Sequence, residues 1–128
     1  MNPKELKYTK SHEWAKIQGN IVVVGISEFA SKQLGDIVFV DVPKPGVQVS
    51  KGKTLGVIES VKTVSDLYAP FSGKVVKANT TLESDPAKVN EDPFGAGWIC
   101  EIEISNPSEG NDLLDATTYE KHCAECAH

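Results

Sequence analysis

The stretch that decides the fold is Leu55–Val76, which reads LGVIESVKTVSDLYAPFSGKVV. Two runs within it, Leu55–Glu59 and Thr63–Ala69, are rich in the residues that favour short strands. They flank Ser60-Val61-Lys62, and a Pro- and Gly-containing turn signal closes the second run. The stretch therefore predicts a β-hairpin with a single lysine, Lys62, at its tip.

Turn glycines lie at nearly equal distances on the two sides of Lys62, with Gly52 ten residues before it and Gly73 eleven residues after it. A β-branched run borders each glycine, Val47–Val49 on one side and Lys74–Val76 on the other. The block therefore has an approximate two-fold internal symmetry with the lysine on its axis. A lysine in an arbitrary turn is usually a solvated surface residue, but this frame favours a functional role.

The hairpin also resembles a known family. Glu59-Ser60-Val61-Lys62 followed by Ser65-Asp66-Leu67-Tyr68 is similar to the lipoyl-attachment hairpin of the glycine cleavage H-protein family. Three further stretches agree with that family in order and register: Tyr8–Trp14 (YTKSHEW), Gly35–Val40 (GDIVFV), and Asn90–Gly95 (NEDPFG) with Gly97-Trp98. The resemblance covers nearly the whole chain, from about Lys7 to about Tyr119.

This resemblance implies a mainly β fold, a barrel-sandwich hybrid of the lipoyl/biotinyl-like kind with short flanking helices and a helical C-terminal tail. It also implies that lipoate is attached to Lys62 through an amide, which removes the ammonium charge. The chemistry then belongs to the cofactor, while the protein supplies position and protection. We therefore expect a non-catalytic carrier rather than an enzyme.

The resemblance further implies a set of partner enzymes. A pyridoxal-phosphate glycine decarboxylase would load the aminomethyl group of glycine, and a folate-dependent aminomethyltransferase would remove it. A dihydrolipoamide dehydrogenase would take the electrons, and a lipoate ligase or lipoyl transferase would attach the cofactor.

Members of this family fold the loaded arm into a surface cleft, and the matching positions here are Ser11, Glu13 and Asp66. A carboxylate in such a cleft suits a cationic aminomethyl group, because burying an ammonium is costly unless it is paired. Without the resemblance, Glu13 reads as an ordinary exposed strand carboxylate and Ser11 as a turn residue.

Residues next to the lysine are predicted to serve recognition. Glu59 and Asp66 bracket Lys62 with negative charge, which could guide a ligase or a partner enzyme by electrostatic complementarity, together with Ser60 and Val61. That these carboxylates only keep a sheet edge soluble is an equally good interpretation.

Two departures from the family pattern stand out. Thr63 and Val64 follow the lysine where the family usually has small residues, although both fit a strand. The tail ends in His122-Cys123-Ala124-Glu125-Cys126-Ala127-His128, a C-x-x-C flanked by histidines. Structural zinc sites usually draw their ligand pairs from separated segments, so we expect no metal there and a frayed or amphipathic end instead.

Composition sets broad limits. A chain of 128 residues without a Pro-, Gly- or Ser-rich linker predicts one domain, residues 1–128, with a core over about 7–104 and a helical tail over 105–128. A net charge of −5 argues against nucleic acid as a partner. No apolar stretch reaches membrane-spanning length, and no signal or transit segment is recognisable. We expect a cytoplasmic monomer, and the three cysteines do not form a disulfide framework.

The remaining elements follow from local patterns. Trp14–Ile17 and Ile21–Ile26 are predicted strands joined by the turn Gly19-Asn20. A short helix, Glu28–Leu34, is predicted between the cap residues Ser27 and Gly35. We expect Phe29, Ala30 and Leu34 on its sheet-facing side.

In the second half, Pro45-Gly46 predicts a type II turn, and Ser84-Asp85-Pro86 starts one helical turn that ends near Asn90. Trp98–Ile104 alternates as a half-buried strand. The residues predicted on its buried face are Trp98, Cys100, Ile102 and Ile104. The tail has Ser108 and Asp115 as candidate helix caps and Leu113, Leu114 and Tyr119 as packing residues.

Other functions stay open at this point. A lipoyl or biotinyl module of another complex is one alternative, but such modules usually come tethered to larger chains and lack the SHEW segment. An H-like lipoate depot or signalling scaffold that does not cycle glycine carbon is another. A thiol enzyme is the least favoured class, because Cys100 is predicted to lie in the core.

Overall fold

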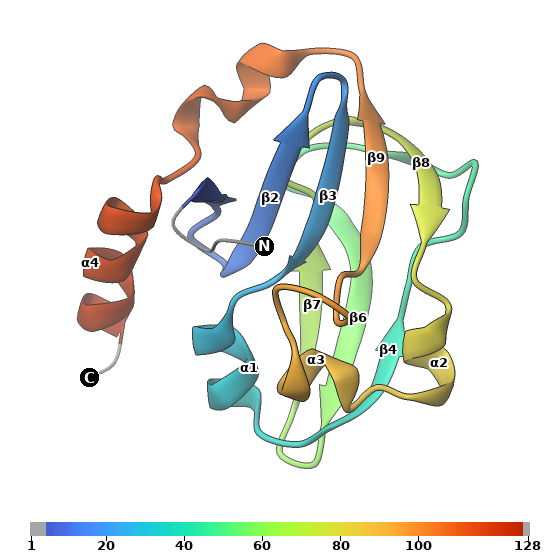
Figure 1. Ribbon diagram of the computed structural model, residues 1–128, viewed down its shortest axis with the longest axis vertical. Coiled ribbons are helices and arrows are strands. Elements are labelled where there is room, and N and C mark those ends of the chain that lie inside the picture. Colours follow the sequence, from blue (N-terminus) through green and yellow to red (C-terminus); the bar gives the residue numbers. More distant parts are fainter. Residues whose placement is uncertain (1–4, 127–128) are drawn as a thin grey trace.

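The computed structural model describes residues 5–126 and consists of two antiparallel sheets that enclose the core (Figure 1). The larger sheet has the strand order β1 (Lys7–Tyr8), β2 (Glu13–Gln18), β3 (Ile21–Ile26), β9 (Cys100–Ile104), β8 (Gly73–Ala78) and β5 (Gln48–Val49). The smaller sheet has the order β4 (Ile37–Asp41), β6 (Thr54–Ser60) and β7 (Val64–Tyr68). The helices are α1 (Glu28–Leu34), α2 (Thr81–Ser84), α3 (Lys88–Glu91), the 3-10 helix η2 (Pro107–Asp112) and α4 (Ala116–Cys126).

This architecture confirms the predicted fold class: mainly β, with short helices and a C-terminal helix, although the two sheets do not close into a barrel. The two β-branched runs on either side of Lys62 form β5 and β8, and these strands pair with each other. Gln48 lies opposite Lys74, and Val49 lies opposite Gly73. The symmetry of the sequence therefore corresponds to a strand pair in the larger sheet.

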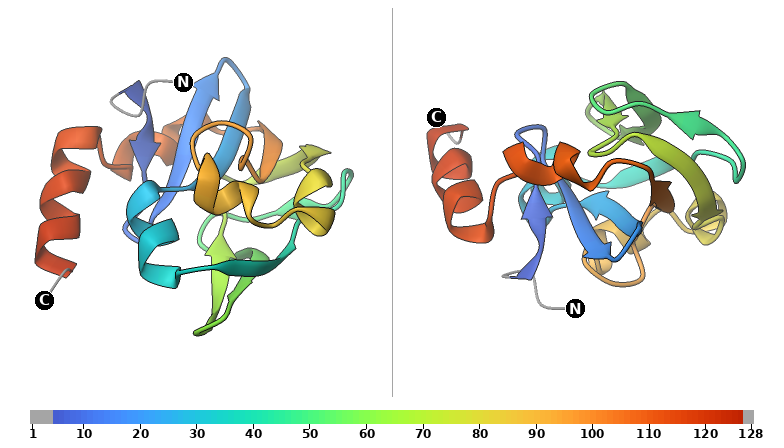
Figure 2. Two further views of the ribbon diagram at one scale, coloured as in Figure 1. Left: turned by 60° about the horizontal axis from the view of Figure 1, so that its bottom comes forward. Right: turned by 90° about the horizontal axis from the view of Figure 1, so that it is seen from above.

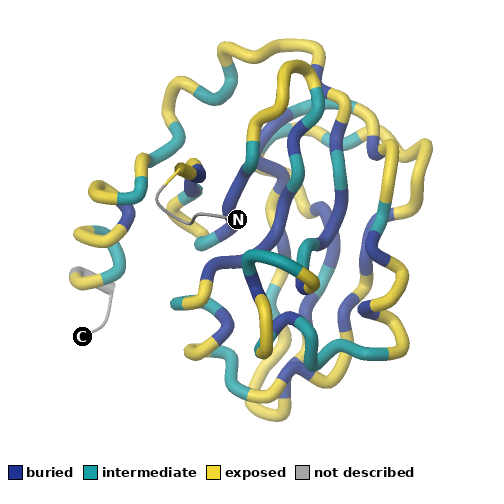
Figure 3. The backbone as a smooth tube through the Cα atoms, viewed as in Figure 1, coloured by how far each residue is buried: buried dark blue, intermediate teal, exposed yellow. Residues whose placement is uncertain are grey.

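Two hydrophobic clusters hold the molecule together. The main cluster fills the space between the sheets, where residues such as Ile58 and Ile102 have no exposed surface. A second cluster joins the N-terminal segment and α4 to the larger sheet. Its buried members are Leu6, Tyr8, Trp14 and Tyr119. Figure 2 shows α4 on one side of the molecule, and Figure 3 shows that its outer surface and the β6–β7 tip are exposed.

Several local predictions are confirmed. The Ser27 hydroxyl accepts a hydrogen bond from the Ala30 amide, so α1 begins at the predicted cap. Gly46 has a φ of 96° in the predicted type II turn, which a residue with a side chain rarely adopts. Trp14 and Cys100 are fully buried.

The orientation of Phe29 differs from the prediction. Ala30 and Leu34 pack on the main cluster as expected, but the Phe29 ring lies 4.9 Å from the His12 ring, on the side of α1 toward α4. Ala30 and Leu34 are four residues apart and share a face, whereas Phe29 lies about 100° around the helix from Ala30. Phe29 therefore packs on His12 and lines a cavity between α1 and α4 rather than facing the sheet.

Trp98 also departs from the predicted alternation. The strand β9 begins at Cys100, and the Trp98 amide instead donates to the Gly95 carbonyl in a turn. Ile99 takes the fully buried position, while Trp98 is half-buried with the Lys77 ammonium 5.7 Å from its ring centroid. The turn interrupts the two-residue periodicity on which the prediction depended.

The helices in the second half of the chain agree only in part with the predicted caps and bounds. Asn106, not Ser108, caps η2, because the Asn106 side chain accepts from the Ser108 amide at 3.2 Å. Asp115 caps α4 as predicted, accepting from the Thr118 amide at 2.8 Å. The helical turn predicted from Ser84 to near Asn90 corresponds to α3, which begins only at Lys88, and the short helix α2 before it, Thr81–Ser84, was not predicted.

The C-terminal tail contains the C-x-x-C flanked by histidines. Within the described part of the chain, no group of three or more His, Cys, Asp or Glu side chains could hold a metal ion. The side chain of Cys126 and all of His128 lie outside what the structure describes. None of the helices in residues 5–126 is long and apolar enough to cross a membrane.

Candidate functional site

The tip of the β6–β7 hairpin is a tight turn built around Ser60. The Ser60 amide donates to the Thr63 carbonyl at 2.8 Å, and the Ser60 hydroxyl accepts from the amides of Lys62 and Thr63, each at 3.1 Å. Ser60 is only 6% exposed, so this hydroxyl is a fixed part of the turn. One buried serine therefore sets the direction in which the lysine leaves the backbone.

Lys62 is exposed at this tip, and its stem runs past the end of α1. A Cβ atom placed on Gly35 would lie 3.3 Å from Lys62 Cε, so the missing side chain of the glycine leaves room for the stem. Val61 anchors the tip to the same segment, because its amide donates to the Asp36 carbonyl at 3.1 Å. Among the described residues, none forms an ion pair with the Lys62 ammonium.

An exposed primary amine on a stiff turn, without a carboxylate partner, is suited to acylation. The space at Gly35, which we call the Gly35 cradle, fits the stem of a long covalent arm, since Lys62 Cδ and Nζ each lie 3.6 Å from the place that a Cβ on Gly35 would take. The residues present at the tip therefore fit the attachment of lipoate.

The outer face of the smaller sheet, next to the tip, carries apolar and acidic side chains. The strand register places residues of β4, β6 and β7 in two rows across this face. The rows are Phe39, Glu59 and Val64, and then Asp41, Val57 and Asp66. Phe39 is 47% exposed, Val61 68% and Val64 61%, so apolar surface lies beside the lysine together with negative charge.

Glu13, at the start of β2, is buried, with 2% of its surface exposed. Its Oε1 atom accepts from the hydroxyls of Thr9 at 2.6 Å and Ser11 at 2.5 Å, and its Oε2 atom accepts from the Tyr68 amide at 3.4 Å. Burial raises the pKa of Glu13, and the hydrogen bonds from Ser11, Thr9 and the Tyr68 amide oppose that rise. This environment is unlike that of an ordinary exposed strand carboxylate.

A cavity of about 300 Å³ is lined in part by Thr9, Ser11 and Tyr68, the three residues that bind this carboxylate, although Glu13 itself does not line it. The other residues of its walls are Lys10, Lys51, Gly52, Ala69, Pro70, Asp112 and Leu113. Asp66 is not among these residues and lies exposed on β7 opposite Val57. The structure thus brings Ser11 and Glu13 together and keeps Asp66 two positions along the strand from Tyr68.

Sequence reasoning missed two donors to Glu13, the Thr9 hydroxyl and the Tyr68 amide. A buried carboxylate must find hydrogen-bond donors, so a prediction of burial at Glu13 would have prompted a search for them. The alternation of β2 gives no such signal, because Glu13, Trp14 and Ala15 are all buried in succession.

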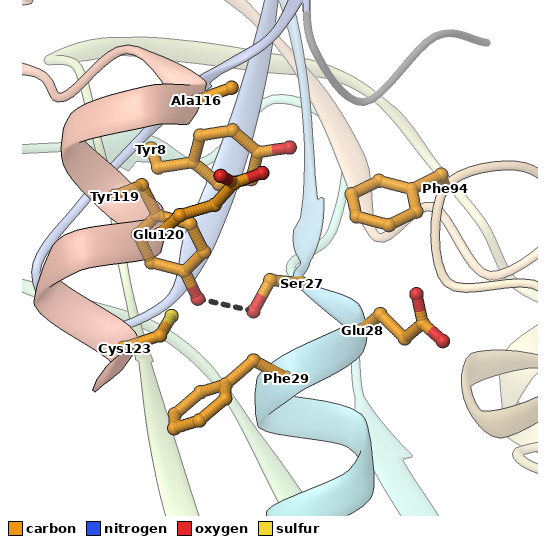
Figure 4. Close-up of a pocket in the computed structure, with 9 residues that line it drawn as sticks. All are labelled: Tyr8, Ser27, Glu28, Phe29, Phe94, Ala116, Tyr119, Glu120 and Cys123. Carbon is orange, nitrogen blue, oxygen red and sulfur yellow. Dashed lines mark hydrogen bonds between the residues drawn. The ribbon is translucent and has the colours of Figure 1, made fainter. Parts of the chain in front are cut away.

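A second cavity, of about 290 Å³, lies between α4, α1 and the N-terminal segment (Figure 4). Figure 4 shows the Tyr119 hydroxyl pointing from α4 toward Ser27, and the two oxygens are 2.5 Å apart. The same hydroxyl lies 2.7 Å from His12 Nδ1. Burial, and then the charge of His122, lower the pKa of His12.

Comparisons with known proteins agree over nearly the whole chain. The family model described as glycine cleavage H-protein matches residues 6–126. The glycine cleavage system H protein of Symbiobacterium thermophilum is 54% identical over 123 residues, 96% of each chain. That of Myxococcus xanthus is 55% identical over 117 residues, 91% of each chain. A crystal structure of the glycine cleavage system H protein from Mycobacterium marinum has a TM-score of 0.85 and 39% identity, covering 99% of this chain and 100% of the other.

Proposed function

The chain belongs to the glycine cleavage H-protein family, and on that premise we propose that it carries lipoate on Lys62 through an amide. Its function is that of the lipoyl carrier in glycine cleavage. The observation that carries the assignment to this lysine is its position: exposed, on a turn fixed by Ser60, with its stem in the Gly35 cradle.

When bound, the lipoyl group would supply a disulfide that accepts the aminomethyl group of glycine on one sulfur, and the dithiol left after that group is passed on would give up its electrons. The residues of the chain act around that chemistry. Ser60 holds the turn and so directs the amine. Gly35 leaves the space through which the stem passes. In this proposal no side chain of the protein forms or breaks a covalent bond with the cargo. That is consistent with a carrier component rather than an enzyme.

We assign the cargo role to Glu13, Ser11 and Asp66. An aminomethyl group is cationic, and a buried carboxylate attracts a cation more strongly than one in water. Glu13 is supported by this burial and by the hydroxyls that stabilise its ionised form. Asp66, which is exposed on β7, can attract the cation but cannot shelter it.

We assign recognition to the surface around the tip. Glu59 and Val61 are both exposed there, so each can contact a lipoate ligase or lipoyl transferase directly. Ser60 is buried and acts through the shape of the turn. The partner enzymes in this proposal are glycine decarboxylase, aminomethyltransferase and dihydrolipoamide dehydrogenase, and the proposed location is the cytoplasm.

Glycine–bicarbonate exchange tests this function against a lipoate depot. The lipoylated chain, mixed with glycine decarboxylase and labelled bicarbonate, should support exchange of label into glycine. A depot protein would carry lipoate, shown by intact mass, and give no exchange.

Cargo release tests the role of Glu13. The aminomethyl group should leave the loaded Glu13→Gln variant about tenfold faster than the wild type, because a hydrogen bond to a charged partner is worth roughly 1.5–3 kcal/mol. Glu83→Gln, which changes an exposed carboxylate on α2, is the matched control. Release from Glu13→Gln at the wild-type rate would remove Glu13 from the proposal.

A further inference from the structure

Residues 9–13, which we call the cargo turn, form one closed unit. The His12 amide donates to the Thr9 carbonyl at 3.1 Å, and the Thr9 amide donates to the Glu13 carbonyl at 2.9 Å. The Thr9 and Ser11 hydroxyls then bind the Glu13 carboxylate. A change in the backbone of this turn therefore alters how the Thr9 and Ser11 hydroxyls meet the Glu13 carboxylate.

The cargo turn contains a backbone conformation that needs support. His12 has a φ of 76°, in the left-handed region that costs a residue with a side chain roughly 1–2 kcal/mol. Such a conformation persists only where surrounding contacts hold it. The Ser27 amide supplies one of them, donating to the His12 carbonyl at 2.9 Å.

The other support for His12 comes from the opposite end of the chain. His12 Nδ1 lies 2.7 Å from the hydroxyl of Tyr119, a residue 107 positions later that is 5% exposed. The same hydroxyl lies 2.5 Å from the Ser27 hydroxyl, which is itself fixed as the cap of α1. The Tyr119 ring stacks on Tyr8 with centroids 4.3 Å apart, which fixes the position of the hydroxyl.

The C-terminal helix holds the cargo turn at a second point. His122 Nε2 lies 2.8 Å from the Lys10 carbonyl, one turn of α4 beyond Tyr119. The segment that leads into the turn is held as well, because Tyr8 and Leu114 exchange backbone hydrogen bonds of 2.8 and 2.7 Å. The C-terminal segment therefore contacts the turn and the strand before it.

We propose that α4 braces the cargo turn and that Tyr119 is a positioning residue for Glu13, acting through His12. This inference rests on the proposed cargo role of Glu13. With the Tyr119 hydroxyl in place, His12 keeps its strained backbone, and the Thr9 and Ser11 hydroxyls stay aimed at the carboxylate. Without it, the turn samples other shapes and the cargo loses part of its shelter.

Tyr119→Phe tests the brace, because it removes the hydroxyl and keeps the ring on Tyr8. In the unloaded chain, amide hydrogen exchange at His12 and Glu13 should become about fivefold faster, the effect of losing one neutral hydrogen bond. Amides of the hairpin tip should not change. Thr117→Ala, which removes an exposed hydroxyl from the same helix, is the matched control. Unchanged exchange in the cargo turn would overturn the proposal.

A double variant separates positioning from general stability. In the loaded chain, Tyr119→Phe should speed cargo release about fivefold, but in the Glu13→Gln background it should add nothing, because the carboxylate it positions is gone. An equal effect in both backgrounds would overturn the positioning role. If Glu13→Gln alone leaves the rate of release unchanged, the proposed cargo role of Glu13 is wrong. If Glu13→Gln speeds release but Tyr119→Phe does not, only the proposed role of Tyr119 is wrong.

Discussion

The hairpin tip and the cargo turn are both short turns that present one charged side chain, yet they are built in opposite ways. The hairpin tip is held mainly by its own residues, and its lysine is exposed. The cargo turn places its carboxylate in the interior and depends on Tyr68 and Tyr119, which come from distant segments. In the proposed function the attachment point must be reachable by other proteins and the cargo site must exclude water, and the exposed Lys62 and the buried Glu13 suit these two needs.

The largest expected effect is the loss of lipoylation when Lys62, at the β6–β7 tip, is replaced. Lys62→Arg should abolish lipoylation, because a guanidinium stays protonated and is not acylated. The fold should be unchanged, since among the described residues no ion pair holds the lysine. Intact mass after incubation with a lipoate ligase measures the result, with the exposed Lys74→Arg as control. A lipoyl mass on Lys62→Arg would show that another lysine is the attachment site.

A pair of glycine substitutions tests whether the space that Gly35 leaves beside the Lys62 stem is needed for lipoylation. Gly35 has φ 79° and ψ −152°, a region open almost only to glycine, so Gly35→Ala should destabilise the fold by about 2 kcal/mol. Gly19 has a φ of 65° and nothing within 4 Å of an added Cβ, so Gly19→Ala should cost about 1 kcal/mol.

Only Gly35→Ala should slow lipoylation, because its Cβ would lie 3.3 Å from Lys62 Cε. Urea unfolding and the rate of lipoylation by the ligase give the two readouts. Equal lipoylation rates for the two variants would mean that the cradle does not position the lysine.

The smallest expected effect is the pH dependence of the cargo turn. Burial raises the pKa of Glu13 above its ordinary value of 4.5, so the folded state binds the proton more tightly than the unfolded state. The resulting stabilisation is fully present below about pH 4.5 and is lost as the pH rises through the folded-state pKa. The stability of the wild type relative to Glu13→Gln should therefore fall with rising pH.

Urea unfolding between pH 4 and 8 measures that difference, and the exposed Glu83→Gln should show no such trend. A relative stability that grows with pH would mean that the Thr9 and Ser11 hydroxyls outweigh the burial of the carboxylate.

Local patterns in the sequence were sufficient for much of this molecule. The hairpin, the lysine at its tip, and the caps Ser27 and Asp115 follow from residues close together in the chain. Prediction was wrong where a neighbour in space decided the outcome. Phe29 turns toward His12 and α4, and a turn displaces Trp98 from the strand.

The sequence by itself determined the turn that presents Lys62, because a β-turn and its lysine need only a few consecutive residues. The tertiary structure alone decided that Glu13 is buried, that Thr9 and the Tyr68 amide bind it, and that Tyr119 reaches His12. The physical reason is that a buried carboxylate must satisfy its oxygens with whichever donors the packing of the chain brings near. One of those donors, the Tyr68 amide, lies 55 positions from Glu13, and the Tyr119 hydroxyl lies 107 positions from the His12 ring that it reaches.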